Sequence, residues 1–223
     1  MRLTEAIGRL EPLPAPLPPP TRAIEPRVLW RPGAAGLPSW ATDGGPPSTR
    51  EAAGLLLLFP DSDGEARVLL TERTRELRHG GQVSLPGGRR EPADDFPAGT
   101  ALREAAEEVG LDPVAAGVRV LGLLDVVDVR VSGFLLTPVL AVAERTPRVA
   151  PDPAEVTAIL VPPVDIFLAD APVTVAELER DGLRIRYGGY PWEGRHVWGA
   201  TARVLAQLGA VLGQGSPGEG GPR

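Results

Sequence analysis

One predicted helix constrains this chain more than any other segment, because it combines an apolar stripe with a cluster of three glutamates. Residues 98–109 are rich in Ala, Leu and Glu, which favour helix, and Gly110 after them is typical of a helix end. At about 100° per residue the glutamates share one side of the helix, within an arc of about 100°. They are Glu104, Glu107 and Glu108. The opposite side carries Leu102, Ala105, Ala106 and Val109. The fold must therefore bury one side of this helix and hold like charges together on the other.

The clustered charge suggests a cation site. Like charges one turn apart destabilise a helix by about 0.2–0.5 kcal/mol per pair. A divalent cation converts this repulsion into binding, and hard cations such as Mg²⁺ take carboxylate, water and phosphate oxygens as ligands. Most acidic runs of this kind are simply a solvated helix face, so the flanking sequence has to decide between the two interpretations.

Composition excludes several classes of protein. The chain has 223 residues and a net charge of −6, which argues against a nucleic-acid-binding protein. It has no cysteine, so disulfides and thiol chemistry are excluded. No apolar run approaches the roughly 18 residues of a membrane span, and the first twenty residues lack the apolar core of a signal peptide. We expect a cytoplasmic protein that binds neither membranes nor nucleic acids, and the sequence leaves a homodimer open.

The chain divides into three parts. In residues 1–50 a short amphipathic turn over 3–10 leads into a proline-rich stretch, and we expect an extended, partly disordered arm. Residues 51–212 should form one compact domain, and residues 213–223 a flexible tail. Within the domain, short apolar runs predict strands and the last element is a predicted helix over 196–212, with Trp198 anchoring it in the core. The predicted strands cover 52–59, 66–73, 82–88, 118–129, 133–144, 156–160 and 183–192. Mixed strands with two or three helices indicate an α+β domain, an α/β/α sandwich around a mixed sheet.

The residues around the acidic helix resemble the Nudix box, G-x5-E-x7-R-E-U-x-E-E-x-G-U, where U is apolar. Gly88 fits its start, and residues 103–111 fit its second half. Asp94 stands at the first glutamate position, with eight residues instead of seven before Arg103; aligning Asp95 there restores seven but lengthens the first gap. The resemblance implies the Nudix fold and hydrolysis of a pyrophosphate bond with Mg²⁺ or Mn²⁺.

A second stretch resembles the coenzyme A pyrophosphatase branch of this family, which commonly shows an Asp in a box loop one residue longer. Residues 69–88 depart from the branch at Thr74 and Leu85, and the loop around His79 is one residue shorter. The end of the domain, HVWGATARVLAQL, is also similar to that branch. The matching positions are Leu69, Leu70, Thr71, Arg73, Leu77, Arg78, Gly81, Gln82, Pro86, Gly87 and Gly88.

The resemblance implies that coenzyme A or an acyl-coenzyme A is cleaved to 4′-phosphopantetheine, or its acyl form, and adenosine 3′,5′-bisphosphate. Two alternatives stay open. One is a Nudix pyrophosphatase acting on another nucleoside diphosphate derivative, such as ADP-ribose or a dinucleotide. The other is a Nudix-fold binding module without turnover, although such modules usually lose box carboxylates and this helix keeps all three.

The candidate metal ligands are Glu104, Glu107 and Glu108, and the resemblance adds the backbone carbonyl of Gly88. Arg103 lies four residues before Glu107, so an ion pair can hold that carboxylate in place. Because an exposed pair of this kind contributes only about 0.3–0.5 kcal/mol, orientation is the better reason for it.

The remaining candidates serve catalysis and substrate binding. Family members take the general base from a box glutamate or from a later loop, where Glu155 is the candidate here, and its alternative interpretation is a solvated turn residue. Arg73 and Arg78 are candidate phosphate ligands, because guanidinium matches phosphate in a bidentate way. Gln82 belongs to the same branch-like stretch and is the third candidate for substrate binding.

Overall fold

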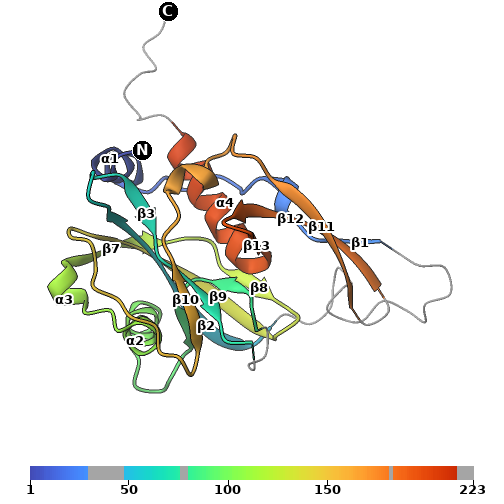
Figure 1. The fold of residues 1–223 in the computed structure, drawn as a ribbon, viewed down its shortest axis with the longest axis horizontal. Helices are drawn as coiled ribbons and strands as arrows, with labels where there is room; N and C mark the ends of the chain where they lie inside the picture. Colours follow the sequence, from blue (N-terminus) through green and yellow to red (C-terminus); the bar gives the residue numbers. More distant parts are fainter. Residues whose placement is uncertain (30–47, 76–79, 181–182, 215–223) are drawn as a thin grey trace, which may run out of the picture.

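The computed structural model describes residues 1–29, 48–75, 80–180 and 183–214 of the 223-residue chain. Its main sheet is mixed: β2 and β9 run parallel, and the strands around them are antiparallel (Figure 1). Along the chain the strands of this sheet are β2 (Arg50–Pro60), β3 (Ala66–Val68), β6 (Gly87–Arg89), β7 (Val118–Leu123), β8 (Val127–Val129) and β9 (Phe134–Ala143).

Helices cover both faces of the main sheet. Successive residues of a strand point to opposite faces, and the continuous apolar run of β2 is buried on both. Leu55 and Leu57 pack with α2 (Ala98–Val109), whereas Leu56 and Leu58 belong to the core that includes α1 and α4. The predicted α/β/α sandwich around a mixed sheet is therefore confirmed, and the acidic helix has the predicted bounds, ending at Gly110 with a φ of 64°.

The strand predicted over 66–73 is divided between two sheets. Leu69 separates β3 from β4 (Leu70–Arg73), and its amide donates a hydrogen bond to the carbonyl of Leu57 on the main sheet, at 3.1 Å. Beyond Leu69 the chain pairs with β10 (Val156–Leu160) and β5 (Val83–Ser84) instead. This second sheet brings Arg73 and the start of β10 to the same end of the molecule as α2.

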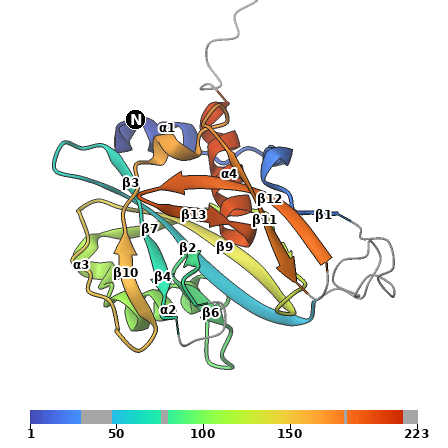
Figure 2. The same ribbon diagram turned by 45° about the vertical axis from the view of Figure 1, so that its right-hand side comes forward.

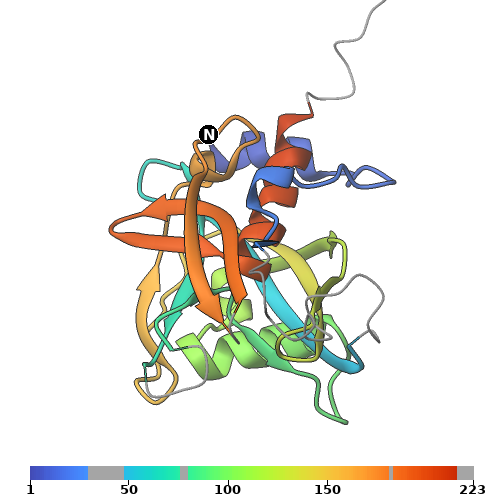
Figure 3. The same ribbon diagram turned by 90° about the vertical axis from the view of Figure 1, so that its right-hand side faces the viewer.

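A third sheet consists of β1, β11, β12 and β13 and lies beside the final helix (Figures 2 and 3). The predicted final helix begins later than expected, because residues 195–198 pair with β12 as a strand. Trp198 is therefore a half-buried strand residue that precedes α4 and not a core anchor within the helix. The bounds are β1 (Arg27–Leu29), β11 (Thr174–Arg180), β12 (Leu183–Trp192), β13 (Arg195–Trp198) and α4 (Gly199–Gly213).

The described part of the N-terminal segment begins with a helix at the position of the predicted amphipathic turn. Helix α1 (Leu3–Leu10) buries Leu3, Ala6 and Leu10, whose spacing of three and four residues forms one apolar stripe. Arg9 fixes the helix against α4 by donating a hydrogen bond to the carbonyl of Leu212, at 2.7 Å. Residues 30–47 of the predicted arm and residues 215–223 of the predicted tail lie outside the described residues.

The remaining short helices connect these layers. No helix in the described part of the chain is long and apolar enough to cross a bilayer. The connecting helices are η1 (Arg22–Ile24), α3 (Pro113–Ala116) and η3 (Val164–Phe167).

Candidate active site

Two consecutive glycines let the backbone approach the acidic helix. A Cβ on Gly87 would lie 2.3 Å from the carbonyl oxygen of Ala53 in the neighbouring strand. A Cβ on Gly88 would lie 2.5 Å from the carboxylate carbon of Glu104. Because real Cβ atoms do not approach other atoms this closely, a side chain at Gly87 would force β6 away from β2, and one at Gly88 would displace the carboxylate of Glu104. The two glycines of β6 thus place main-chain atoms directly against a carboxylate of α2.

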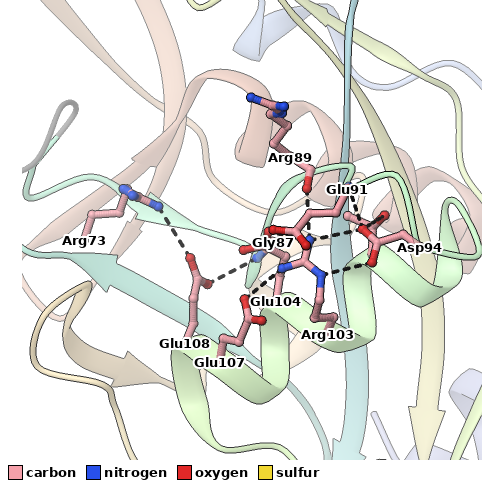
Figure 4. Close-up of polar contacts among 10 residues, drawn as sticks. Arg73, Gly87, Arg89, Glu91, Asp94, Arg103, Glu104, Glu107 and Glu108 are labelled. Atoms are coloured by element: carbon pink, nitrogen blue, oxygen red, sulfur yellow. Dashed lines mark hydrogen bonds and ion pairs between the residues drawn. The ribbon is translucent and has the colours of Figure 1, made fainter.

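Glu108 is the most deeply buried carboxylate of the site, with an exposed fraction of 2%. One carboxylate oxygen accepts a hydrogen bond from the amide of Gly87, at 3.2 Å, and the other from Nη1 of Arg73, at 3.5 Å (Figure 4). The helix face therefore differs from the predicted one. Glu108 lies on the packed side together with Ala105, whereas Ala106, predicted to pack, is exposed.

Burial changes the acidity of two of these carboxylates. It raises the pKa of Glu108 to about 7; the Gly87 amide and Arg73 oppose the shift, and the charges of Glu104 and Glu155 add to it. The pKa of Glu104 is also raised, first by burial, and the neighbouring Arg103 opposes this. The two carboxylates thus lie where negative charge is insufficiently compensated, which is a common property of catalytic and metal-binding sites.

Arg103 connects the acidic residues of the site. Its guanidinium lies 2.8 Å from a carboxylate oxygen of Glu107 and 3.0 Å from one of Glu104. It also donates a hydrogen bond to the backbone carbonyl of Arg89, at 3.0 Å, on the strand that carries the glycines. Arg103 therefore links α2 to β6 and restricts the orientation of both glutamates, whereas Glu107 itself stays exposed (Figure 4).

Asp94 holds Arg103 and was not among the candidate residues predicted from the sequence. Its two carboxylate oxygens accept hydrogen bonds from Nε and Nη2 of Arg103, at 3.0 and 3.1 Å. It also accepts hydrogen bonds from the backbone amide of Glu91 and the hydroxyl of Thr100, both at 2.8 Å. The arginine holds the pKa of Asp94 well below its usual range. The sequence signal was its place at the first acidic position of the box; Asp95 is exposed.

The other predicted residues lie around this centre. Glu155 is exposed immediately before β10, and its charge reaches both Glu104 and Glu108, since it raises the pKa of each. The backbone carbonyl of Gln82 accepts a hydrogen bond from the amide of Arg73, at 3.0 Å. Arg78 lies outside the described residues.

An ion pair on β13 was also missed from the sequence. Nε of Arg195 lies 2.8 Å from a carboxylate oxygen of Glu72, the residue before Arg73. The two residues are 123 positions apart in the chain, so only the fold brings them together.

The donors that could hold a divalent cation are the carboxylates of Glu104 and Glu108 with the carbonyl of Gly88. Within the described ranges no three acidic or histidine side chains converge as a preformed metal site. Each carboxylate is instead turned towards Arg73, Arg103 or the Gly87 amide. The donor set nevertheless fits a hard cation, because it consists of oxygen atoms and lies where burial leaves two carboxylates short of positive charge.

Comparisons with known proteins agree with this architecture. The family model described as "NUDIX domain" matches residues 48–180. "Nudix hydrolase 22, chloroplastic" of Arabidopsis thaliana is 37% identical over 180 residues, which cover 75% of this chain and 57% of that protein. "Uncharacterized Nudix hydrolase NudL" of Pectobacterium atrosepticum is 39% identical over 142 residues, or 63% of this chain and 72% of that protein.

The second plant relative, "Nudix hydrolase 15, mitochondrial" of Arabidopsis thaliana, is 36% identical over 75% of this chain and 60% of that protein, so the chain spans less than two thirds of either plant relative. Among solved structures, a Nudix hydrolase from M. smegmatis, RenU, is 30% identical over 52% of this chain and 72% of that chain, with a TM-score of 0.45. The family model covers more than half of the chain and includes the whole of α2 and both glycines of β6. The chain therefore belongs to the Nudix family.

Proposed function

We propose that this protein is a Mg²⁺- or Mn²⁺-dependent hydrolase of the pyrophosphate bond in nucleoside diphosphate derivatives. The observation that carries the proposal is the environment of Glu108, a buried carboxylate that lies near Glu104, accepts a hydrogen bond from the Gly87 amide of β6 and has a pKa raised to about 7. Ionising such a buried carboxyl group without a counter-charge costs free energy. The group is therefore well suited to a site where a bound ligand supplies positive charge.

The acidic residues would bind the cation, and the cation would act on both the substrate and a water molecule. A pyrophosphate and the site's carboxylates repel each other, and a bound divalent cation relieves this, polarises the phosphoryl group and lowers the pKa of a bound water. Glu104 and Glu108, with the Gly88 carbonyl, would hold the cation. The exposed Glu107, which directly precedes Glu108, would be a third carboxylate ligand. Arg103 restricts the orientation of the Glu104 and Glu107 side chains through its ion pairs with both.

Two residues at the rim complete the proposed chemistry. The side chain of Arg73 is 28% exposed and only 3.5 Å from Glu108, so it can bind a phosphate oxygen next to the carboxylates. Glu155 is the proposed general base: it is exposed, its charge reaches both buried glutamates, and an ionised carboxylate can accept a proton from attacking water.

For the substrate we propose coenzyme A or an acyl-coenzyme A, cleaved to 4′-phosphopantetheine, or its acyl form, and adenosine 3′,5′-bisphosphate. The support is the resemblance of residues 69–88 to the coenzyme A pyrophosphatase branch. Within this stretch β4 supplies Arg73 and β6 supplies Gly87 as hydrogen-bond donors to Glu108. A substrate-specific motif is expected next to the reacting phosphates.

A panel of purified pyrophosphates tests both the proposed hydrolase activity and the proposed preference for coenzyme A. Coenzyme A, 3′-dephospho-coenzyme A, ADP-ribose and a diadenosine polyphosphate are incubated with the full chain and Mg²⁺, and the products are separated by chromatography. We expect coenzyme A to give the highest kcat/KM. A preference for ADP-ribose or the dinucleotide refutes the coenzyme A assignment and leaves the hydrolase, whereas cleavage of none of the four favours a binding module.

A further inference from the structure

We infer that Arg73 is the counter-cation of Glu108 in the metal-free site and turns from this carboxylate to a substrate phosphate when a divalent cation binds, an inference that rests on the proposed function. Nη1 of Arg73 lies 3.5 Å from Oε1 of Glu108. Among the described residues, Arg73 alone forms an ion pair with this buried carboxylate. The positive charge beside Glu108 therefore comes from a side chain, whose place a bound cation could take.

The two oxygens of the Glu108 carboxylate are contacted by donors of different kinds. Oε2 accepts a hydrogen bond from the amide of Gly87, at 3.2 Å, and Gly87 is fixed by its pairing with Gly54 of β2. Oε1 is contacted by the Arg73 side chain, and 3.5 Å lies beyond the usual range of about 2.7–3.2 Å for such hydrogen bonds. The contact made by Arg73 is therefore the weaker of the two and the one that can be exchanged.

The backbone of Arg73 is fixed, whereas its side chain is free to turn. The Arg73 amide donates a hydrogen bond to the carbonyl of Gln82, at 3.0 Å, and its carbonyl accepts one from the amide of Gly81, at 2.9 Å. Its side chain is 28% exposed, and within the described ranges its one hydrogen bond is the contact with Glu108. A guanidinium has five N–H donors, so several remain for phosphate oxygens. The guanidinium can thus change partners without any change in the sheet.

Arg103 also carries a positive charge at this site, but several contacts hold it in place. Its guanidinium donates two hydrogen bonds to Asp94 and one to the backbone carbonyl of Arg89. Losing its contact with Glu104 would break none of these. Arg73 has no comparable anchor in the part of the chain that the structure describes, so Arg73 is the arginine whose position can follow the charge of the site.

A guanidinium and a divalent cation that share one carboxylate repel each other. A cation held by either oxygen of Glu108 would lie close to the guanidinium that contacts the same group, well within the screening length of about 10 Å at 0.1 M salt. Burial of Glu108 reduces this screening further. Arg73 should therefore lower the affinity of the free protein for the cation.

The same repulsion couples metal binding to substrate binding. When Arg73 binds a phosphate oxygen it no longer neutralises Glu108, so the substrate raises the affinity of the site for the cation. Coupling between two binding free energies is reciprocal, so the cation raises the affinity for the substrate by the same factor. The site would thus bind its pyrophosphate substrate tightly only when the metal is present.

The test measures Mg²⁺ affinity by calorimetry in the absence of substrate. The full chain and its variants are freed of metal with EDTA, desalted and titrated with Mg²⁺ at pH 8.5, where the carboxylates are ionised. We expect Arg73→Met to bind Mg²⁺ about fivefold to 150-fold more tightly than the wild type, the range usual for coupling between two sites. Arg73→Lys keeps the charge and should bind Mg²⁺ much as the wild type does. Arg184→Met removes the same charge from an exposed position of β12 and is the matched control.

Urea denaturation separates this role from a purely structural one. In EDTA at pH 8.5, Arg73→Met should be less stable than the wild type, because Glu108 has lost its counter-charge. Saturating Mg²⁺ should abolish this difference, since the cation then supplies the charge. An arginine that only packs would cost the same stability with and without Mg²⁺. Arg73→Gln is a second neutral variant, which keeps the test decisive if Arg73→Met fails to fold.

Unchanged or weaker Mg²⁺ affinity in a folded neutral variant overturns the counter-cation. If the wild type then still cleaves pyrophosphates with Mg²⁺, the proposed hydrolase stands. Tighter Mg²⁺ binding in the neutral variants of a chain that cleaves no pyrophosphate has the opposite meaning, because it retains the counter-cation and refutes the hydrolase.

Discussion

Asp94 accepts two hydrogen bonds from the guanidinium of Arg103, at 3.0 Å from Nε and 3.1 Å from Nη2. The same guanidinium contacts Glu104 and Glu107. The loop before α2 therefore fixes the arginine, and the arginine in turn restricts two carboxylates of the site. Asp94 accepts four hydrogen bonds, from Arg103, Glu91 and Thr100. They restrict the orientation of its carboxylate and thereby that of Arg103.

We predict that Asp94→Asn lowers kcat or Mg²⁺ affinity by about tenfold to a hundredfold, the range usual for residues that orient metal ligands. The asparagine keeps the size of the side chain but loses the charge that aligns Arg103. Steady-state kinetics over a Mg²⁺ titration measures both quantities. Asp95→Asn, at the exposed neighbouring position, is the matched control. A larger effect at Asp95 than at Asp94 would show that the other alignment of the box is the functional one.

Glu108→Gln should keep the fold and lower kcat by at least about a hundredfold, the scale expected for losing a principal electrostatic group. The glutamine can still accept the hydrogen bond from Gly87 but cannot supply the negative charge. The measurement is kcat at saturating Mg²⁺ with the folded state checked by circular dichroism. Turnover close to that of the wild type would rule out Glu108 as a main metal ligand.

The raised pKa of Glu108 also predicts how stability depends on pH. Because its folded pKa of about 7 exceeds the ordinary 4.5, the protonated form stabilises the fold. This stabilisation is complete below pH 4.5 and is lost as the pH rises through 7. The free energy of unfolding should fall by about 3 kcal/mol over this range. In EDTA, the wild type should therefore lose more stability between pH 5 and pH 8 than Glu108→Gln. Urea denaturation at both pH values measures this, and an identical loss in both proteins contradicts the assigned burial.

Glu155→Gln should lower kcat by about 10²–10⁴-fold while leaving Mg²⁺ affinity largely unchanged, if Glu155 is the general base. Its exposed position and its electrostatic reach to Glu104 and Glu108 motivate the prediction. The pH dependence of kcat identifies the loss of a basic group. An effect below about threefold moves the role of the base to Glu104 or Glu107.

The substrate prediction concerns the 3′-phosphate, which distinguishes coenzyme A from ADP-ribose. Hydrogen bonds to charged groups contribute about 1.5–3 kcal/mol each, so its removal should lower kcat/KM by about tenfold to a hundredfold. Because Arg73 lies next to Glu108, Arg73→Ala should lower kcat/KM for coenzyme A and 3′-dephospho-coenzyme A alike; loss of the preference for coenzyme A alone would assign Arg73 to the 3′-phosphate instead. Arg184→Ala, on the exposed side of β12, serves as control. Arg78→Ala tests the second candidate, and equal cleavage of both substrates by the wild type refutes the 3′-phosphate idea.

Local pattern was enough to predict the bounds of α2 and most of the strands, because helix propensity, a glycine end signal and apolar runs act within a few residues. It did not predict β11, in which charged and apolar residues alternate only over 177–179 and which is stabilised by pairing with β12. Nor could it divide residues 66–73 at Leu69, because that break depends on where Leu57 and β10 lie in the fold.

The same limit applies to the site. The three glutamates and Arg103 follow from spacing along one helix, but the burial of Glu108 depends on Gly87 in β6 and on Arg73, which lies 35 residues away in the chain. The position of Asp94 could be recognised from the sequence, because it stands at the first glutamate position of the Nudix box. The Arg195–Glu72 pair had none, because its partners are brought together only by the packing of β13 on the second sheet.

The most direct test of the central claim is a metal titration of coenzyme A hydrolysis by the wild type and by the double variant Glu104→Gln/Glu108→Gln. The protein is first treated with EDTA, and Mg²⁺ or Mn²⁺ is then added back while 4′-phosphopantetheine release is measured. We predict no turnover without metal, saturable recovery in the wild type, and no recovery in the folded double variant at any metal concentration. Hydrolysis that persists in EDTA, or that the double variant recovers in full, would contradict a carboxylate-bound metal at this site.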